Sequence, residues 1–368
     1  MVGTRPEVIK VAPVVFAARR EGIETIILNT GQHRDLSADA LAGFGLASDI
    51  DLDVMTESQS PSDVAAKVLV AMGPVLREIN PSWVLVQGDT TTVLAAGIAA
   101  SYEKIPLGHI EAGLRSHDRS QPFPEEINRR VVGSIADLHF APTQTAANAL
   151  LSENVEPHRV LLTGNTVIDA LHWACAQQPR QPDDPRLAKI DTSRPMVLFT
   201  THRRENFGPK LHHIFDSVET LLEARPDLQF VYPVHPNPEV RAVAYERLGH
   251  LDSVTLTDPL SYLDIAWLLD ICCAVLTDSG GLQEEGPALA KQVVVLREVT
   301  ERPEAVDVGM AHLVGTDPSK IVPQLLAAVD NQSNPRVSPY GDGQAAERIV
   351  DALLGREVVP FIANQGRV

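Results

Sequence analysis

Three carboxylates in the first half of the chain lie where parallel strands are predicted to end or just beyond. Asp89 follows the apolar run Trp83–Val86, Glu111 follows a second apolar run, and Glu125 opens an arginine-rich segment. Each has an ordinary structural explanation, because Asp89 suits a helix N-cap and glutamates beside arginines suit a solvent-facing ion pair. Three such carboxylates in one lobe fit general acid–base chemistry better. We therefore predict proton transfer by Asp89, Glu111 and Glu125.

The second half of the chain contains a segment that suits a phosphate group, residues 277–285 with the sequence TDSGGLQEE. Its two glycines permit close approach of the backbone, and a following helix would direct its free N–H groups and positive dipole end at the anion. Glu285, about one turn further along, can accept hydrogen bonds from ribose hydroxyls. The structural alternative is a capped helix start with Ser279 or Asp278 as the N-cap. The segment favours a pyrophosphate site.

Two further segments carry cations next to predicted strands or helices. His202 stands with two arginines directly after the run Met196–Thr200, which makes it a candidate for pyrophosphate binding or acid–base work, although a lone histidine is more often structural. The opening segment 3–10, GTRPEVIK, could hold an anion at a helix N-terminus, and an ordinary surface turn explains it about equally well. It is not a P-loop, because the glycine–lysine spacing of that motif is absent.

The elements that must position these residues follow a βαβ pattern, in which short β-rich apolar runs alternate with longer amphipathic stretches. Gly, Asp or His follows most of the runs, at the strand end where ligands bind in doubly wound sheets. We predict an α/β fold with two Rossmann-like domains. The predicted strands are Glu24–Leu28, Trp83–Val86, Pro106–Ile110, Leu138–Ala141, Val160–Leu162, Met196–Thr200, Gln229–Val234, Val254–Leu256, Ala274–Leu276 and Gln292–Leu296.

The 368 residues exceed what one hydrophobic core usually serves, so two domains are expected. Residues 177–195 are rich in proline and charge and separate two βα series, which predicts a linker. The expected domains are 1–176, which carries the carboxylates, and 196–340, which binds the nucleotide. Residues 341–368 are expected to form a helix over 341–354 and a tail, packing back towards the N-terminal domain.

Composition excludes several classes of protein. A formal net charge of −17 argues against a general role with nucleic acid or membrane surfaces, because polyanions would be repelled. The three cysteines, Cys175, Cys272 and Cys273, lack metal-ligand spacing and are typical of reduced cytosolic thiols, so no metal is expected. No run approaches ~20 apolar residues and no secretory signal is present, so we expect a cytoplasmic protein.

Taken together, the chain resembles the bacterial non-hydrolysing UDP-N-acetylglucosamine 2-epimerase family. Ten matching motifs span nearly the whole chain in order, which makes the resemblance very specific. The resemblance implies a GT-B-like fold, a homodimer, a UDP-sugar substrate, and no metal or redox cofactor. The motifs are GTRPEVIK, GDTTT, HIEAGLRS, PEEINR, GNTVIDAL, THRRENFG, VYPVHPNP, LTDSGGLQEE, TERPEAV and PYGDGQA.

The resemblance also implies a role for each candidate residue, with UDP in an interdomain cleft and held mainly by the C-terminal lobe. Ser279, Gly280 and Gly281 would bind the diphosphate and Glu285 the ribose. Asp89, Glu111 and Glu125 would lie near the sugar ring. The cations that would line the phosphates and the sugar are Arg5, Lys10, Arg129, His202 and Arg302.

The family's chemistry explains the need for several carboxylates. The C2 proton of the sugar is weakly acidic, because no adjacent carbonyl takes up the charge, so direct deprotonation is implausible. The family instead eliminates UDP from C1 while a base removes the C2 proton, giving a 2-acetamidoglucal. UDP then adds back with protonation of C2 from the other face. Acid and base duties fall among Asp89, Glu111 and Glu125, and His202 assists the leaving phosphate.

Three departures from the family pattern bear on these expectations. Members usually have a β-strand before GTRPE, so the first strand of the N-terminal sheet is expected to be missing here. Ile265 occupies the place where an aromatic residue often lines the uracil. Many members bind a second UDP-N-acetylglucosamine as an activator, and here the Gln32-His33 pair matches that loop while Lys67 replaces a downstream arginine. Lysine cannot reproduce the bidentate geometry of arginine, so allosteric activation stays open.

Three other functions remain as alternatives. A hydrolysing epimerase would release UDP and N-acetylmannosamine, and water exclusion would separate it from the non-hydrolysing enzyme. A GT-B glycosyltransferase shares the fold but does not require the three carboxylates in this pattern, and it would depend on an acceptor. A non-catalytic sugar-nucleotide sensor would have no need for proton-transfer groups, which makes it the least favoured.

Overall fold

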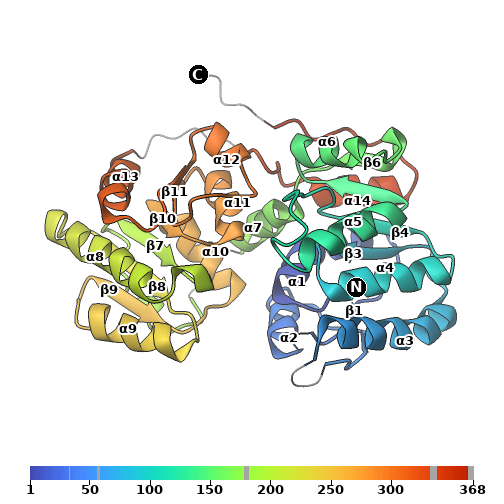
Figure 1. Ribbon diagram of the computed structural model, residues 1–368, viewed down its shortest axis with the longest axis horizontal. Helices are drawn as coiled ribbons and strands as arrows, with labels where there is room; N and C mark the ends of the chain where they lie inside the picture. Colours follow the sequence, from blue (N-terminus) through green and yellow to red (C-terminus); the bar gives the residue numbers. More distant parts are fainter. Residues whose placement is uncertain (33, 56–58, 178–181, 332–337, 364–368) are drawn as a thin grey trace. The chain divides into compact units, whose positions relative to one another are not determined.

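The computed structural model describes residues 1–32, 34–55, 59–177, 182–331 and 338–363. The chain forms two compact units, one of residues 1–170 with 340–362 and the other of residues 171–339 (Figure 1). The division falls inside helix α7 (Thr166–Ala176), and α14 (Ala345–Leu353) belongs to the first unit.

The second unit is built on one six-stranded parallel sheet in the order β12-β11-β10-β7-β8-β9. Numbered along this unit the order is 3-2-1-4-5-6, the doubly wound Rossmann arrangement. Its topological switch point lies between β7 and β10, where ligands bind in such sheets. The strands are β7 (Met196–Thr200), β8 (Gln229–Pro233), β9 (Val254–Thr257), β10 (Ala274–Thr277), β11 (Gln292–Val295) and β12 (Ala311–Leu313).

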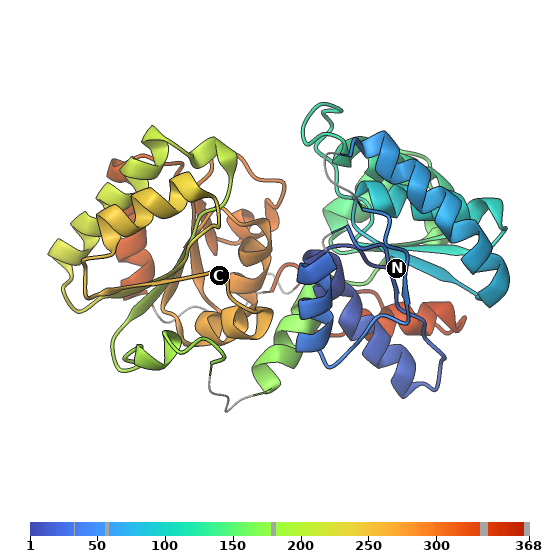
Figure 2. The same cartoon turned by 90° about the horizontal axis from the view of Figure 1, so that it is seen from below.

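Helices cover both faces of this sheet, as Figures 1 and 2 show. Most strand residues are buried, and the ring of Phe215, a residue of α8 (Pro209–Ala224), meets the rings of Phe199 and Tyr232 edge-on in the core. Continuous apolar strands such as Val293–Leu296 are what a parallel sheet covered on both faces requires. The helices are η2 (Leu187–Lys189), η3 (Arg204–Asn206), α8 (Pro209–Ala224), α9 (Pro238–Leu248), α10 (Tyr262–Ile271), α11 (Gly280–Ala288), α12 (Glu304–Asp307) and α13 (Pro318–Asp330).

The first unit contains a four-stranded parallel sheet, β3-β4-β5-β6, and a two-stranded parallel sheet, β1-β2. Val2 forms a parallel bridge with Asn29, and the Met1 amino group donates to the Leu85 carbonyl at 2.9 Å. The first two residues therefore lie between β1 and β3 and occupy the place expected to lack a strand. The strands are β1 (Leu28–Asn29), β2 (Ile50–Asp51), β3 (Val84–Gln87), β4 (Leu107–Ile110), β5 (Leu138–Ala141) and β6 (Val160–Leu162).

Helix α1 of this unit begins at a capping box. The Thr4 side chain accepts from the Glu7 amide, and Glu7 Oε2 accepts from the Gly3 and Thr4 amides at 2.6 and 3.1 Å. This capping anchors the segment that carries Arg5 and Lys10. The helices of the unit are α1 (Arg5–Arg20), α2 (Arg34–Gly43), α3 (Pro61–Ile79), α4 (Thr91–Tyr102), α5 (Glu125–Ile135), α6 (Gln144–Ser152), η1 (Pro157–Arg159) and α14.

The parallel sheets with helices confirm the predicted α/β class. The prediction of a strand over Glu24–Leu28 is wrong in its extent, because only Leu28–Asn29 pair, with Val2 on one side and Ile50–Asp51 on the other. The short strands β2 and β12 were not predicted. Within the part of the chain that the structure describes, no helix is long and apolar enough to cross a membrane.

Candidate active site

Glu111 follows the last residue of β4, in the first unit, and is buried. Its φ of +62° lies in the left-handed region, which costs a non-glycine residue on the order of 1 kcal/mol or more. Such strain persists only where the surroundings impose it, and it is common at active sites. Six other non-glycine residues of the described chain also have a positive φ, so the contacts of the Glu111 side chain, rather than its backbone alone, identify it as a candidate.

Three side chains hold the Glu111 carboxylate. Lys10 Nζ donates to Oε1 at 2.5 Å, Asn165 Nδ2 donates to Oε1 at 3.2 Å, and the Gln87 amide donates to Oε2. Ammonium and amide N–H groups donate only, so together they favour the ionised carboxylate. The structure thus brings the predicted residues Lys10 and Glu111 together, as an ion pair that is largely buried.

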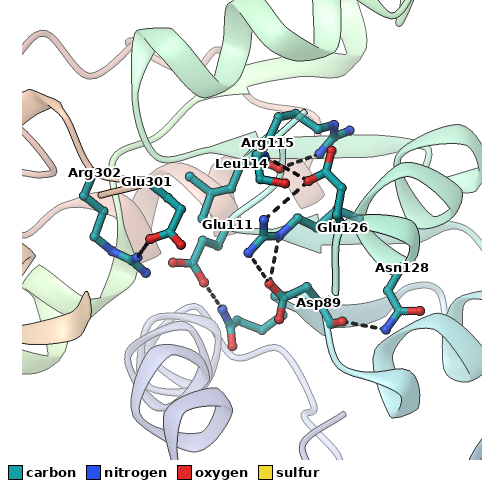
Figure 3. Close-up of polar contacts among 12 residues, drawn as sticks. Asp89, Glu111, Leu114, Arg115, Glu126, Asn128, Glu301 and Arg302 are labelled. Atoms are coloured by element: carbon teal, nitrogen blue, oxygen red, sulfur yellow. Dashed lines mark hydrogen bonds and ion pairs between the residues drawn. The ribbon is translucent and has the colours of Figure 1, made fainter. Parts of the chain in front are cut away.

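Asp89 lies just beyond β3 and is held by α5. Arg129 contacts Asp89 Oδ2 through Nε at 2.8 Å and through a terminal nitrogen at 2.7 Å, and Asn128 donates to the Asp89 carbonyl at 2.8 Å (Figure 3). The predicted residues Asp89 and Arg129 are therefore partners. The N-cap of α4 is Thr90, not Asp89, so the capping explanation of this carboxylate is wrong.

Two adjacent glutamates at the start of α5 have different environments. Glu126 is fully buried and accepts from the Ser116 amide at 3.0 Å and from Arg130 at 3.0 Å. Burial opposes ionisation of Glu126, but the Ser116 amide and the Arg130 guanidinium outweigh it and lower its pKa. Glu125 is half-buried, and its buried Oε2 has no hydrogen-bond partner among the residues that the structure describes. Glu126 is thus held by the protein's own groups, whereas one oxygen of Glu125 is not hydrogen-bonded by any of the described residues.

His109 holds the turn that carries Asp89. Its Nε2 donates to the Gly88 carbonyl at 2.7 Å, and Gly88 has a φ of +79°. Burial lowers the pKa of His109 to about 4, so its imidazole is neutral at physiological pH. The contact with the Gly88 carbonyl links His109 to the backbone immediately before Asp89.

The N-terminus of α11, in the second unit, has the form of an anion site. Ser279 is the N-cap residue, but its side chain makes no capping hydrogen bond, and the first two helical residues are Gly280 and Gly281. A Cβ at position 280 would lie 2.8 Å from a terminal nitrogen of Arg302, so glycine lets the guanidinium approach the helix start. Free N–H groups beside a cation favour an anion over a side-chain cap.

Two glutamates of α11 fix the groups around this helix start. Arg302 Nε donates to Glu284 Oε1 at 2.5 Å, and a terminal nitrogen of Arg302 lies 3.8 Å from Glu301 (Figure 3). Glu285 is buried and accepts from the Tyr262 hydroxyl at 2.9 Å. The predicted phosphate ligand Arg302 is therefore oriented by carboxylates.

His202 follows β7 and contacts Asp278, which follows β10. His202 Nδ1 lies 2.9 Å from Asp278 Oδ1, while 47% of the His202 side chain is exposed. The two strands are neighbours at the switch point of the sheet, so the segments after them meet. The imidazole is held on one side and open on the other.

The remaining predicted residues have less specific settings. Arg5 begins α1 and is half-buried. Gln32 accepts from Thr92 Oγ1 at 3.0 Å, and Lys67 is exposed on α3. His33, the other residue of the pair that the resemblance links to an activator, lies outside the described residues. Ile265 is half-buried on α10.

Five residues around the predicted ones were not predicted to have a functional role from the sequence. Each lies inside or beside one of the motifs identified there. Gln87 directly precedes the Gly-Asp turn, and Glu126 adjoins the chosen Glu125. Asn165 lies in the GNTVIDAL motif, which had no assigned role. The other two are His109 and Asp278. No group of three or more His, Cys, Asp or Glu side chains suited to a metal occurs in the described ranges.

Comparison with known proteins identifies close relatives over the whole chain. A family model described as UDP-N-acetylglucosamine 2-epimerase matches residues 17–354. The UDP-N-acetylglucosamine 2-epimerase of Escherichia coli strain K12 is 44% identical over 368 residues, covering 97% of this chain and 98% of the relative. The protein of the same name from Bacillus subtilis strain 168 is 42% identical, with 96% and 93% coverage.

Solved structures of similar proteins have the same architecture. The Neisseria meningitidis UDP-GlcNAc 2-epimerase bound to UDP-GlcNAc matches with a TM-score of 0.86 and 39% identity, covering 96% of this chain and 98% of that chain. The Methanocaldococcus jannaschii UDP-GlcNAc 2-epimerase in complex with UDP-GlcNAc and UDP matches with a TM-score of 0.80 and 32% identity, with 96% and 98% coverage. These similarities confirm the GT-B-like fold class.

Proposed function

Since the chain belongs to the UDP-N-acetylglucosamine 2-epimerase family, we propose that it interconverts UDP-N-acetylglucosamine and UDP-N-acetylmannosamine without hydrolysis. The reaction inverts C2 of the sugar, and the nucleotide is both leaving group and nucleophile. In the first half, the C2–H and C1–O bonds break, giving a 2-acetamidoglucal and UDP. In the second half, UDP oxygen bonds to C1 again while C2 receives a proton on its other face.

The observation that carries this proposal is the setting of Glu111. A base that removes a proton from carbon must be ionised and fixed, and three N–H donors hold this carboxylate at a strained backbone position. We assign Glu111 to proton removal in one direction. Glu125, with a buried oxygen that has no hydrogen-bond partner among the described residues, is the group that exchanges a proton on the other face. Asp89, held by Arg129, completes the set.

The second unit is assigned the nucleotide. The helix start at Ser279, Gly280 and Gly281 offers backbone N–H groups to the diphosphate, and Arg302 adds a cation beside it. Glu285 accepts from the ribose hydroxyls, and His202 stabilises the charge of departing UDP. Local cations thus bind a dianion despite the net charge of −17.

Proton NMR of the protein with UDP-N-acetylglucosamine in deuterium oxide tests the proposal. We expect deuterium at C2 together with new anomeric signals of UDP-N-acetylmannosamine. Accumulation of free N-acetylmannosamine and UDP would identify a hydrolysing epimerase instead. Exchange at C2 without a second sugar nucleotide, or no exchange at all, would contradict the proposal.

We extend the proposal to a cytoplasmic homodimer. Cys175, Cys272 and Cys273 are sparse and suit a reducing compartment. The UDP-sugar is the expected partner, with no role for nucleic acid. Light scattering after size-exclusion chromatography tests the dimer, which would have twice the 39.9 kDa mass of the chain.

A further inference from the structure

Asp278 is a buried carboxylate that the proposed chemistry does not yet use. It follows β10 directly and is fully buried. A buried charge is costly unless several groups compensate it. Sequence reasoning offered it only as a cap for α11, but the N-cap of that helix is Ser279.

The hydrogen bonds to the Asp278 carboxylate all come from the segment after β7. Oδ2 accepts from Thr201 Oγ1 at 2.8 Å, from the Arg203 amide at 3.0 Å and from Asn206 Nδ2 at 2.9 Å. Oδ1 accepts from the His202 amide at 3.0 Å and lies 2.9 Å from His202 Nδ1. One carboxylate therefore holds both the backbone and the imidazole of the predicted phosphate-binding segment.

These donors decide the charge of the carboxylate. Burial alone would raise the pKa of Asp278, but the His202 imidazole, the Arg203 amide and the Thr201 hydroxyl lower it to about 2. The group is therefore ionised throughout the neutral range. An ionised carboxylate can only accept a hydrogen bond, so the proton between the two side chains belongs to His202 Nδ1.

The consequence for the imidazole is a fixed orientation. With Nδ1–H turned to Asp278, Nε2 is the ring nitrogen left for a ligand, and nearly half of the side chain is exposed. Serine-protease triads use the same relation, in which a buried aspartate fixes the histidine tautomer and stabilises the imidazolium that forms. In this protein the imidazolium would face an anion rather than a nucleophile.

We propose that Asp278 is a positioning residue that fixes His202 with Nδ1–H inward and Nε2 outward, so that an imidazolium donates from Nε2 to the diphosphate of departing UDP. This inference rests on the proposed role of His202. It adds the mechanism by which the second unit fixes the orientation of that histidine. Asp278 itself does not touch the substrate.

The first test is Asp278→Asn. The asparagine oxygen can still accept from Thr201, Arg203 and Asn206, whereas its NH₂ group would face His202 Nδ1 and force the opposite tautomer. The Nε2–H tautomer can still donate to the diphosphate but lacks the positive charge of the imidazolium, so we expect kcat to fall about 10-fold, with a smaller change in KM. In ¹⁵N-histidine-labelled protein, with His202 signals assigned through His202→Gln, the protonated nitrogen should move from Nδ1 to Nε2.

Thr201→Val is the matched control. It removes one donor to the same carboxylate and leaves the contact with the imidazole, so the His202 tautomer should stay unchanged and kcat should fall far less than in Asp278→Asn. An equal loss of kcat in the two variants, with the His202 tautomer unchanged in both, would show that Asp278 only stabilises the segment after β7. That result would overturn the inference. A wild-type protein with Nδ1 unprotonated at neutral pH would also overturn it, even if Asp278→Asn fails to fold.

Failure of the underlying function is distinguishable. One outcome is that His202→Gln has the kcat of the wild type while Asp278→Asn still changes the tautomer of His202. In that case His202 has no role in catalysis, and Asp278 orients a histidine that the reaction does not use. That outcome would overturn the catalytic part of the inference.

Discussion

At the scale of single residues, the site combines carboxylates that the fold restrains to different degrees. Glu111 accepts from Lys10, Gln87 and Asn165 and has a strained backbone, whereas one oxygen of Glu125 has no hydrogen-bond partner in the part of the chain that the structure describes. Asp89 is paired with Arg129. Differences of this kind let similar side chains take different parts in one proton-transfer sequence.

Glu111→Gln should separate chemistry from binding. The amide keeps the size of the side chain but cannot remove a proton, so we expect turnover to fall by about 10²–10⁴-fold. The dissociation constant of UDP should change by less than about threefold, because UDP is assigned to the other unit. Turnover is measured by the NMR assay and affinity by calorimetry. Glu103→Gln, which alters only the surface pair with Arg77, should behave like the wild type. Wild-type turnover in Glu111→Gln would remove this residue from the mechanism.

The lowered pKa of His109 should make the free energy of unfolding depend on pH. Burial lowers its pKa in the folded state to about 4, below the ordinary value of 6.5 for histidine, so the unfolded chain binds a proton more readily between these pH values. The contribution of His109 is therefore present above about pH 6.5 and is lost as the pH falls towards 4, by about 1.4 kcal/mol per pH unit.

The measurement is a pair of urea titrations at pH 7.5 and pH 5 for the wild type and His109→Gln. Glutamine can still donate to the Gly88 carbonyl but does not titrate. The variant should lose about 2 kcal/mol less free energy of unfolding than the wild type on acidification. His158→Gln, at an exposed position, serves as control and should follow the wild type. Parallel losses in wild type and His109→Gln would contradict the lowered pKa.

At the scale of elements, the ends of the strands decide where the chemistry lies. Gly113, two residues beyond Glu111, has a φ of +91°, and a Cβ there would lie 2.2 Å from the Ala146 carbonyl oxygen of α6. Close packing of the chain after β4 against α6 thus requires glycine. The same contact fixes the path of the segment that leaves the site.

Gly113→Ala should therefore be far more harmful than an ordinary glycine substitution. The left-handed backbone costs alanine about 1–2 kcal/mol, and the clash with backbone adds to it. Gly45→Ala is the matched control, because Gly45 also has a positive φ but no atom within 4 Å of the added Cβ. We expect a loss of about 1 kcal/mol, or 2–4 °C in Tm, for Gly45→Ala and several times more for Gly113→Ala. An equal decrease in Tm for the two variants would show that α6 moves to accommodate the added methyl group.

Element prediction succeeded for several apolar runs, both buried and half-buried. The strands Leu138–Ala141, Val160–Leu162 and Met196–Thr200 were predicted with the bounds that the structure gives. It failed for β2 and β12, whose short segments Ile50–Asp51 and Ala311–Leu313 carry too few apolar residues to stand out from their surroundings. These short edge strands are defined by hydrogen bonding to a neighbouring strand, and this pairing leaves no periodic pattern in the sequence.

The site was less predictable than the strands for a related reason. Motif position indicated Glu111 and His202, but the partners that give them their properties come from distant segments: Asn165 for Glu111 and Asp278 for His202. Buried polar contacts between separate βα units depend on strand order, which a single sequence states only indirectly. Glu126 was not predicted because the sequence does not distinguish two adjacent glutamates. Only the orientation of helix α5 shows that Glu126 is the buried one.

At the scale of the whole molecule, a chain of net charge −17 must bind a nucleotide diphosphate through local groups. Beyond about 10 Å the remaining charges are largely screened at 0.1 M salt, so contacts at the binding residues decide affinity. Lys10 and Arg129 in the first unit already pair with Glu111 and Asp89. The second unit adds a helix start whose N-cap side chain makes no capping bond, and Arg302, which is itself paired with Glu284, lies beside it.

Hydrogen exchange across the whole chain should therefore locate UDP on the second unit. At a UDP concentration of 100 times Kd, binding stabilises by about 2.7 kcal/mol, so amides that exchange only through opening of the occupied site should slow about 100-fold. We expect this slowing in peptides that cover α11 and the segment 201–206, with little change around Asp89 and Glu111. Arg302→Met should abolish it at the same UDP concentration, while Glu111→Gln should retain it. Equal slowing of exchange in both units would mean that cations of the first unit also bind UDP. The assignment of UDP binding to the second unit alone would then be wrong.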